Sequence, residues 1–286
     1  MARKPSTGEL FLGGVIIAMV TFVATQVIAS PDRSMNGKPG RTLTGRDSAG
    51  IAAQYHAQLS RKRPRYDVPS WLADVHIARL QAVAEREVAG LEPVEPLATD
   101  SVQRLIEAAR SGSYLVSMLD EDGGIVTRWR AREDPIRVWV QPYSSSGRFS
   151  PEFVGPARRG FTAWNEVGLG VTFAMVDDSL DAEVHVMWSD AMPSIGQLGT
   201  TFRMTASSGW LALAQVTLST SYDVYTMQNT ARHEAGHVLG LGHSPDSRDI
   251  MAGATEGRQY MITEADRRTA MALYALPPGD VAGSRD

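Results

Sequence analysis

The spacing of apolar residues changes along the chain, from a helical period in the first part to strand-like alternation in the second. Before residue 112, apolar residues recur at near-helical intervals and predict helices over 50–60, 70–89 and 100–111. From about Pro135 onward, short alternating stretches and a long amphipathic helix indicate an α+β or α/β domain. The expected strands cover 136–140, 171–176, 183–188, 198–204 and 211–218.

A β-hairpin is expected between these two regions. Residues 114–118 and 125–129 are largely apolar, and they flank residues 120–124, an acidic stretch that ends in two glycines. Glycine readily adopts the positive φ of a tight turn, so the pattern predicts two strands joined by this stretch. We interpret its acidic side chains as a solvated turn rather than a cation site.

Three helices in the second half begin at recognisable capping residues. In the last of them Asp266 follows Thr263 by three residues, which nearly matches a capping box. Ser150 precedes Pro151, which suits the first position of a helix because it has no N–H to leave unpaired. Asp223 can cap a later helix with an apolar stripe at Val224, Met227, Ala231, Ala235 and Val238.

The N-terminal segment differs from the rest of the chain. Residues 10–29 are almost wholly apolar and follow Arg3 and Lys4, which is typical of a targeting or membrane segment. The length is close to the roughly 20 residues of a membrane-spanning helix, so an uncleaved membrane anchor and a cleaved signal peptide both fit. Either interpretation implies an exported protein, extracellular, periplasmic or membrane-anchored. Residues 30–50 read as a linker.

Charge and cysteine content narrow the possible functions. The 286-residue chain has a formal net charge of −4, which argues against nucleic acid as a partner because phosphate binding requires a surplus of Lys and Arg. It contains no cysteine, so disulfides are excluded and a metal site must use histidines and carboxylates.

Three of the six histidines occur within eleven residues. His233 and His237 lie one helical turn apart, so both imidazoles can face one metal ion. His243 follows six residues later, about 240° around a straight helix and about 9 Å along it, which is out of reach. Gly240 allows the positive φ that ends a helix and turns the chain back, so His243 can reach the same ion.

This arrangement predicts a catalytic zinc site. Three neutral imidazoles leave one position open on a tetrahedral zinc ion. Glu234 lies beside the first ligand and is expected to act as the general base toward a zinc-activated water molecule. We therefore expect His233, His237 and His243 to bind one zinc ion, with Glu234 as the catalytic residue.

The string His-Glu-x-x-His-x-x-Gly-x-x-His resembles the motif of metzincin zinc metalloproteases, and Ser244 after the third histidine resembles the matrixin branch, which includes the matrix metalloproteases. By that resemblance, Met251 belongs to a tight turn beneath the zinc, the Met-turn. Four further segments, which bring the resemblance to roughly half of the chain, are similar to the family's first strand, first helix, third strand and final helix: 136–142, 161–165, 182–186 and 263–276.

The resemblance implies a metzincin-like α+β domain with a mixed, twisted five-stranded sheet, an active-site helix and a C-terminal helix, preceded by a mainly helical region. It also implies that residues 211–218 form the edge strand above the substrate cleft and that 253–260 wall the specificity pocket. Matrixins often bind a second zinc and calcium, but 189–196 lacks histidine. We expect His185, the one histidine nearby, to be a core or surface residue rather than a ligand. Calcium is possible by resemblance alone, with no site identified.

These observations divide the chain into four expected regions. They are 1–30, a signal peptide or membrane anchor; 31–131, a linker and mainly helical prosegment or accessory region; 132–277, the catalytic domain; and 278–286, a tail. The expected function is zinc-dependent endopeptidase action on protein or peptide substrates. Two alternatives stay open, a zinc-stabilised binding module without catalysis and a zinc hydrolase of a non-protein amide.

Overall fold

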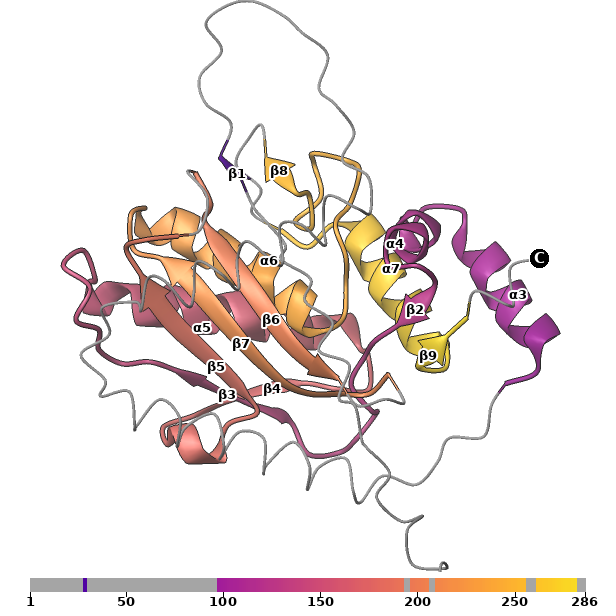
Figure 1. Cartoon of the computed structure of the whole chain (residues 1–286), viewed down its shortest axis with the longest axis horizontal. Helices are drawn as coiled ribbons and strands as arrows, with labels where there is room; N and C mark the ends of the chain where they lie inside the picture. Colours follow the sequence, from indigo (N-terminus) through magenta and orange to yellow (C-terminus); the bar gives the residue numbers. More distant parts are fainter. Residues whose placement is uncertain (1–27, 30–96, 193–195, 206–208, 256–260, 282–286) are drawn as a thin grey trace, which may run out of the picture.

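A computed structural model describes the chain over residues 28–29, 97–192, 196–205, 209–255 and 261–281 (Figure 1). The α-helices are α3 (Thr99–Ala109), α4 (Leu115–Glu121), α5 (Val154–Thr162), α6 (Val224–Val238) and α7 (Glu264–Ala275). Short 3-10 helices occur at η1 (Pro151–Phe153), η2 (Ala163–Val167) and η3 (Ser179–Asp181). The predicted helix over 100–111 is therefore confirmed as α3, whereas those over 50–60 and 70–89 lie outside the described residues.

The strands form one five-stranded sheet and two small pairs. The sheet contains β3 (Ile136–Val140), β4 (Phe173–Val176), β5 (Val184–Ser189), β6 (Gly199–Thr205) and β7 (Leu211–Ser219). The pairs are β1 (Ile28–Ala29) with β8 (Ala254–Thr255), and β2 (Ile125–Val126) with β9 (Gly279–Asp280). Most of the apolar N-terminal segment falls outside the description, and no described helix combines the length and apolar character needed to cross a membrane.

The large sheet has the order β4-β3-β5-β7-β6. The first four strands in this order run parallel, and β6 runs antiparallel to β7. Alternate residues of β3 are buried, as its apolar and polar pattern predicted. The expected α+β fold with a mixed five-stranded sheet, an active-site helix and a C-terminal helix is confirmed.

The prediction that residues 211–218 form the edge strand is wrong. They lie within β7, which pairs with β5 on one side and β6 on the other, so β6 is the strand at the edge. The physical reason is visible in burial: nearly every residue of β7 is buried, as expected for an inner strand, whereas burial alternates along β6.

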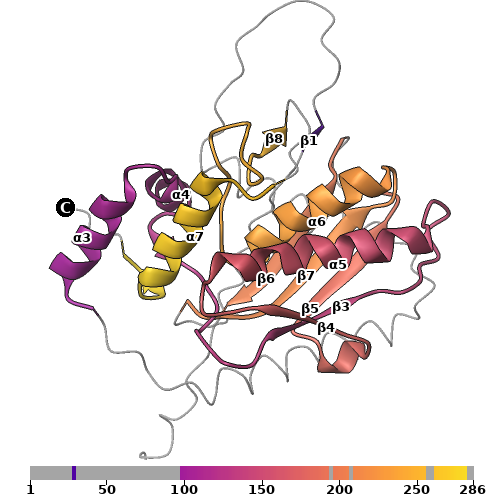
Figure 2. The ribbon, with the colours of Figure 1, turned by 180° about the vertical axis from the view of Figure 1, so that it is seen from behind.

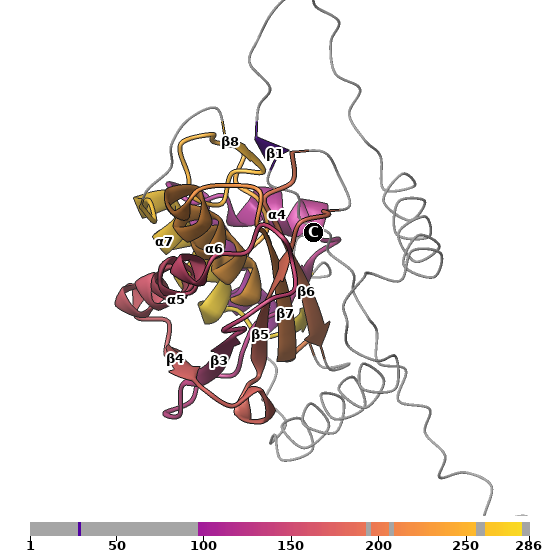
Figure 3. The same ribbon diagram turned by 90° about the vertical axis from the view of Figure 1, so that its left-hand side faces the viewer.

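Two helices cover one face of the sheet (Figures 2 and 3). Ser150 accepts a hydrogen bond from the N–H of Glu152 and starts the helical segment that continues into α5, as its capping pattern predicted. Helix α5 packs tightly on α6 at Gly160, where an added Cβ would lie 2.7 Å from the Cβ of Ala231. The two helices lie side by side, with α5 against β3 and β4 and α6 against β6 and β7. The residues of α6 from Thr230 onward are therefore buried.

The predicted hairpin over 114–129 is also wrong. Residues Leu115–Glu121 form α4, in which Leu115, Met118 and Leu119 are buried on one face. Their spacing of three and four residues matches a helix, and a short apolar run of this kind fits either structure in sequence alone. Of the second expected strand, Ile125–Val126 forms β2 and Arg128 forms an isolated β-bridge with Trp210.

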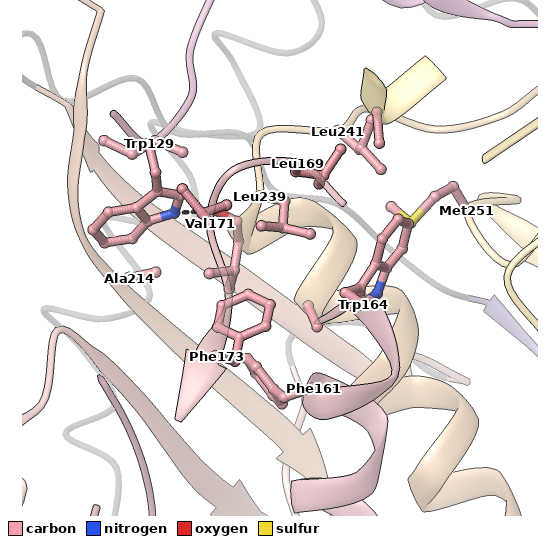
Figure 4. Close-up of a cluster of buried hydrophobic side chains, with 14 of the residues drawn as sticks. Trp129, Phe161, Trp164, Leu169, Val171, Phe173, Ala214, Leu239, Leu241 and Met251 are labelled. Carbon is pink, nitrogen blue, oxygen red and sulfur yellow. Dashed lines mark hydrogen bonds between the residues drawn. The ribbon is translucent and has the colours of Figure 1, made fainter. Parts of the chain in front are cut away.

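One apolar core runs through the described chain. It includes Val102 and Ile106 of α3, continues through the sheet and α6, and ends at Val281. Figure 4 shows a central part of it, in which Trp164 lies beside Met251. The side chain of Trp129 is buried, and its Nε1 donates a hydrogen bond to the carbonyl oxygen of Val238, 2.7 Å away. Residues on both sides of the expected boundary at 131 and 132 therefore share this core.

Candidate metal centre

Helix α6 presents two histidines at its buried C-terminal end. Asp223 caps the helix by accepting a hydrogen bond from the N–H of Thr226 at 2.8 Å, as its sequence pattern predicted. His233 and His237 lie one turn apart and are almost fully buried. Their Nε2 atoms are 2.9 Å apart, so both rings point toward one location.

His243 reaches the same location because the chain reverses after α6. Gly240 has φ of 105°, and an added Cβ would lie 2.1 Å from the carbonyl oxygen of Thr127. Both features require glycine at this position. The His243 ring centroid lies 5.4 Å from that of His233 and 4.9 Å from that of His237.

The structure thus brings all three predicted ligands together. Their candidate ligand atoms lie within 4.8 Å of one another, and in the described ranges no second group of three His, Asp or Glu side chains is arranged to hold a metal ion. His185 lies elsewhere: it is buried, with Nε2 2.8 Å from the carbonyl oxygen of Ser179, which fits a core residue rather than a ligand.

Backbone carbonyl groups fix the tautomers of two of the histidines. The Nδ1 of His233 lies 2.6 Å from the carbonyl oxygen of Ile250, and the Nδ1 of His237 lies 2.8 Å from that of Leu241. A carbonyl oxygen only accepts, so each Nδ1 carries the hydrogen and each Nε2 presents a lone pair. The Nε2 of His243 is buried and has no hydrogen-bond partner among the described residues. A cation is the natural partner for three converging lone pairs.

Burial keeps these imidazoles neutral, which is the form that binds metal. Desolvation, helped by the nearby His243, lowers the pKa of His233 to about 3. Desolvation also lowers the pKa of His243 to about 4. For His237, burial and the two neighbouring imidazoles lower the pKa well below its ordinary value. Protons therefore compete weakly with a metal ion at neutral pH.

Glu234 is fully buried between α6 and the edge strand β6. Thr201 donates a hydrogen bond from Oγ1 to Oε2 of Glu234 at 2.5 Å, while Oε1 has no hydrogen-bond partner within the described structure. Gly199 makes room for the carboxylate, since a Cβ there would lie 2.6 Å from Oε1. Desolvation raises the pKa of Glu234 to about 8, partly offset by the Thr201 bond.

Sequence reasoning missed Thr201 and Gly199, which contact Glu234 from β6. A glycine inside a strand often marks the close approach of another group, and this signal was present at Gly199 but was not used. No local signal singles out Thr201, because it is 33 residues from Glu234 in sequence. The contact arises only from the packing of α6 on the sheet.

The turn that contains Met251 packs against α6 and contacts His233 through Ile250. Met251 is fully buried, and Gly236 of α6 makes room for it: an added Cβ would lie 2.2 Å from the Met251 sulfur and 2.9 Å from Cζ2 of Trp164. Asp266 of α7 accepts a hydrogen bond from the N–H of Ile250 at 3.0 Å. Thr263 and Asp266 also form the predicted capping box of α7.

A Gly236→Ala substitution should destabilise the fold by about 1–3 kcal/mol, the usual cost of overpacking a core. The new methyl group would overlap Met251 and Trp164, which are held by the surrounding core. Urea unfolding measures the effect. Gly147→Ala is the matched control, because no atom lies within 4 Å of an added Cβ at that position. Equal stability of the two variants would contradict the packing described here.

The residues of this site lie within a stretch that matches a known protein family. Residues 136–275 match the sequence model of the matrixin family. Metalloendoproteinase 1 of Glycine max is 29% identical over 168 residues, which are 53% of this chain and 54% of that protein. Metalloendoproteinase 1-MMP of Arabidopsis thaliana is 30% identical over 138 residues, 42% of this chain and 37% of that protein. The chain therefore matches about half or less of the length of these relatives. Through residues 136–275, the chain belongs to the matrixin family.

Proposed function

We propose that this chain is a zinc-dependent endopeptidase in which His233, His237 and His243 hold one zinc ion. The observation that carries the proposal is the convergence of three buried imidazole nitrogens, two of them oriented by backbone carbonyl groups. Three neutral imidazoles suit a catalytic zinc site, which keeps one coordination position open. A zinc ion there supplies a Lewis acid that polarises the peptide carbonyl and lowers the pKa of water to about 7.

Glu234 is proposed to be the general base. In its ionised form the carboxylate takes the proton of the attacking water molecule, and Thr201 orients it through the bond to Oε2. Its pKa of about 8 lies close to neutral pH, which suits a group that must both accept and release a proton. The partnerless Oε1 keeps a lone pair available for that proton. A site with only a structural or binding role does not require this carboxylate, so Glu234 favours the enzyme over a silent binding module.

The edge strand β6 is proposed to bind the substrate. Within the described sheet β6 pairs only with β7, so it is the strand at the edge. An extended peptide can add to such an edge as a further strand, with its main chain held whatever its side chains are. This mode of binding suits an endopeptidase better than a hydrolase of a non-protein amide.

The protein is proposed to act outside the cytoplasm. The apolar segment 10–29 after Arg3 and Lys4 favours this location, because the pattern is typical of a cleaved signal peptide or an uncleaved membrane anchor. Residues 31–96 are proposed to be a spacer, a prosegment or an accessory region. The tail expected over 278–286 is corrected in part, because Gly279–Asp280 pairs with β2 as β9 and Val281 is buried in the core. An exported location is also compatible with a chain that contains no cysteine to oxidise.

The purified chain should carry about one tightly held zinc ion and should cleave an unfolded protein in a chelator-sensitive manner. Elemental analysis measures the first result, and mass spectrometry of the products measures the second. Two zinc ions per chain would reveal a second metal site. Retained zinc without cleavage of any peptide would favour the binding module or the non-protein amide hydrolase.

A further inference from the structure

The region before the family-matched residues is joined to the metal site by hydrogen bonds. Tyr114, at the start of α4, is buried, and its hydroxyl donates to Oδ1 of Asp266 at 3.0 Å. The N–H of Tyr114 donates to Oγ1 of Thr269 at 3.0 Å. Both partners lie on α7, so the start of α4 is attached to that helix at two points.

Asp266 continues this connection to the first histidine. Its Oδ2 accepts a hydrogen bond from the N–H of Ile250 at 3.0 Å, and its Oδ1 accepts a longer one from the N–H of Met251 at 3.4 Å. The carbonyl oxygen of Ile250 in turn accepts the hydrogen bond of His233 Nδ1. One buried carboxylate therefore links the Tyr114 hydroxyl to the peptide that orients His233.

The same region also contacts the return loop that carries the third histidine. Met118 of α4 lies against Gly242, where an added Cβ would be 2.6 Å from Met118 Cγ. The carbonyl oxygen of Thr127 occupies the space beside Gly240, and Trp129 donates its hydrogen bond to Val238. The loop from α6 to His243 is thus enclosed on one side by residues 118–129.

We propose that residues 97–131 are a permanent support of the metal site rather than a removable prosegment, and that Tyr114 is a positioning residue for His233, acting through Asp266 and Ile250. Without its hydroxyl, Oδ1 of Asp266 keeps only the long bond from Met251. Oδ2 keeps its hydrogen bonds from Ile250 and Thr263, so the carboxylate stays attached on that side. Loss of the bond at Oδ1 lets the carboxylate rotate, and this loosens the Ile250 peptide that orients His233. This proposal rests on the proposed function only for the choice of zinc as the metal.

The first test is Tyr114→Phe in the full chain. Zinc affinity, measured by competition with a chromophoric chelator, should weaken about 10-fold, the low end for partners outside the ligand shell. The visible spectrum of the cobalt-loaded protein, which reports ligand geometry, should also change. Thr220→Val is the matched control: it removes a buried hydroxyl that contacts Ser146 and Ser189, before the first turn of α6 and far from His233.

The second test requires no metal. In limited digestion of the folded chain, trypsin can cleave the proposed support after Arg104, Arg110, Arg128 and Arg130. The smallest stable core should retain residues 97–131, as shown by its mass. A stable core that starts after residue 131 would overturn the proposal. Unchanged zinc affinity and an unchanged cobalt spectrum in Tyr114→Phe would also overturn it. Equal changes in Thr220→Val would overturn it as well, because they would indicate a general loosening of the fold.

These outcomes are separable from the proposed activity. A parent protein that binds zinc and cleaves no peptide would refute the endopeptidase function, while the chelator competition and digestion would still decide the role of the support. A parent that binds no zinc would likewise refute that function, and the digestion alone would then decide whether 97–131 is permanent. Activity measurements therefore enter neither test.

Discussion

Replacing Glu234 with glutamine should lower turnover at least about 100-fold, the low end of what a positioned general base contributes. Glutamine has almost the same size and can still accept the hydrogen bond from Thr201, so the packing between α6 and β6 should persist. Its amide cannot take a proton from water at neutral pH. Single-turnover cleavage of a good peptide measures the loss, and elemental analysis should show the zinc content of the parent.

The control for this variant is Glu264→Gln, the same chemical change at an exposed residue. Glu264 pairs with Arg268 on the surface of α7, an interaction that contributes little. The turnover of the Glu264→Gln variant should equal that of the parent. Undiminished cleavage by the Glu234 variant with zinc in place would show that another group is the base.

His237→Ala should abolish tight zinc binding and, with it, peptide cleavage. The substitution removes the middle imidazole, whose Nε2 lies 2.9 Å from that of His233, and leaves two ligands where a catalytic zinc site has three. It also removes the donor to the carbonyl oxygen of Leu241, which shapes the return toward His243. Zinc content after dialysis should fall close to zero.

His185→Ala provides the comparison for His237→Ala, because His185 is equally buried and lies outside the three-histidine group. That variant should lose stability through the cavity and the missing contact with Ser179, yet keep its zinc. Zinc loss in both variants would mean that the metal depends on general packing. Zinc retained in His237→Ala would remove this histidine from the ligand set.

The parts of the structure that sequence predicted well depend on local signals. The cap at Asp223, the reversal at Gly240 and the capping box of Thr263 and Asp266 each involve residues within a few positions of one another. Local chemistry determines such features, because the interacting groups meet as soon as the helix or turn forms. The convergence of three histidines within eleven residues belongs to this class.

The parts that sequence reasoning missed depend on tertiary packing. The run 114–118 fits a strand or a helix in isolation, and its burial against α7 and Gly242 decides for the helix. β7 is buried on both faces and is therefore an inner strand of the sheet, whereas β6 lies at the edge. Asp266 was expected to cap α7, but its second role, holding the Ile250 peptide, becomes visible only when α7 and the Met251 turn are in place.

The hydrogen bond between Tyr114 and Asp266 affects when, during synthesis, the chain becomes able to bind a metal ion tightly. The two residues are 152 positions apart, and α7 lies near the end of the chain. Contacts of such long sequence separation form late, since the intervening chain must first be ordered. A growing polypeptide that already displays all three histidines therefore still lacks the framework that aligns them. Full metal affinity is therefore expected only once α7 has been synthesised and has packed against α4 and the Met251 turn.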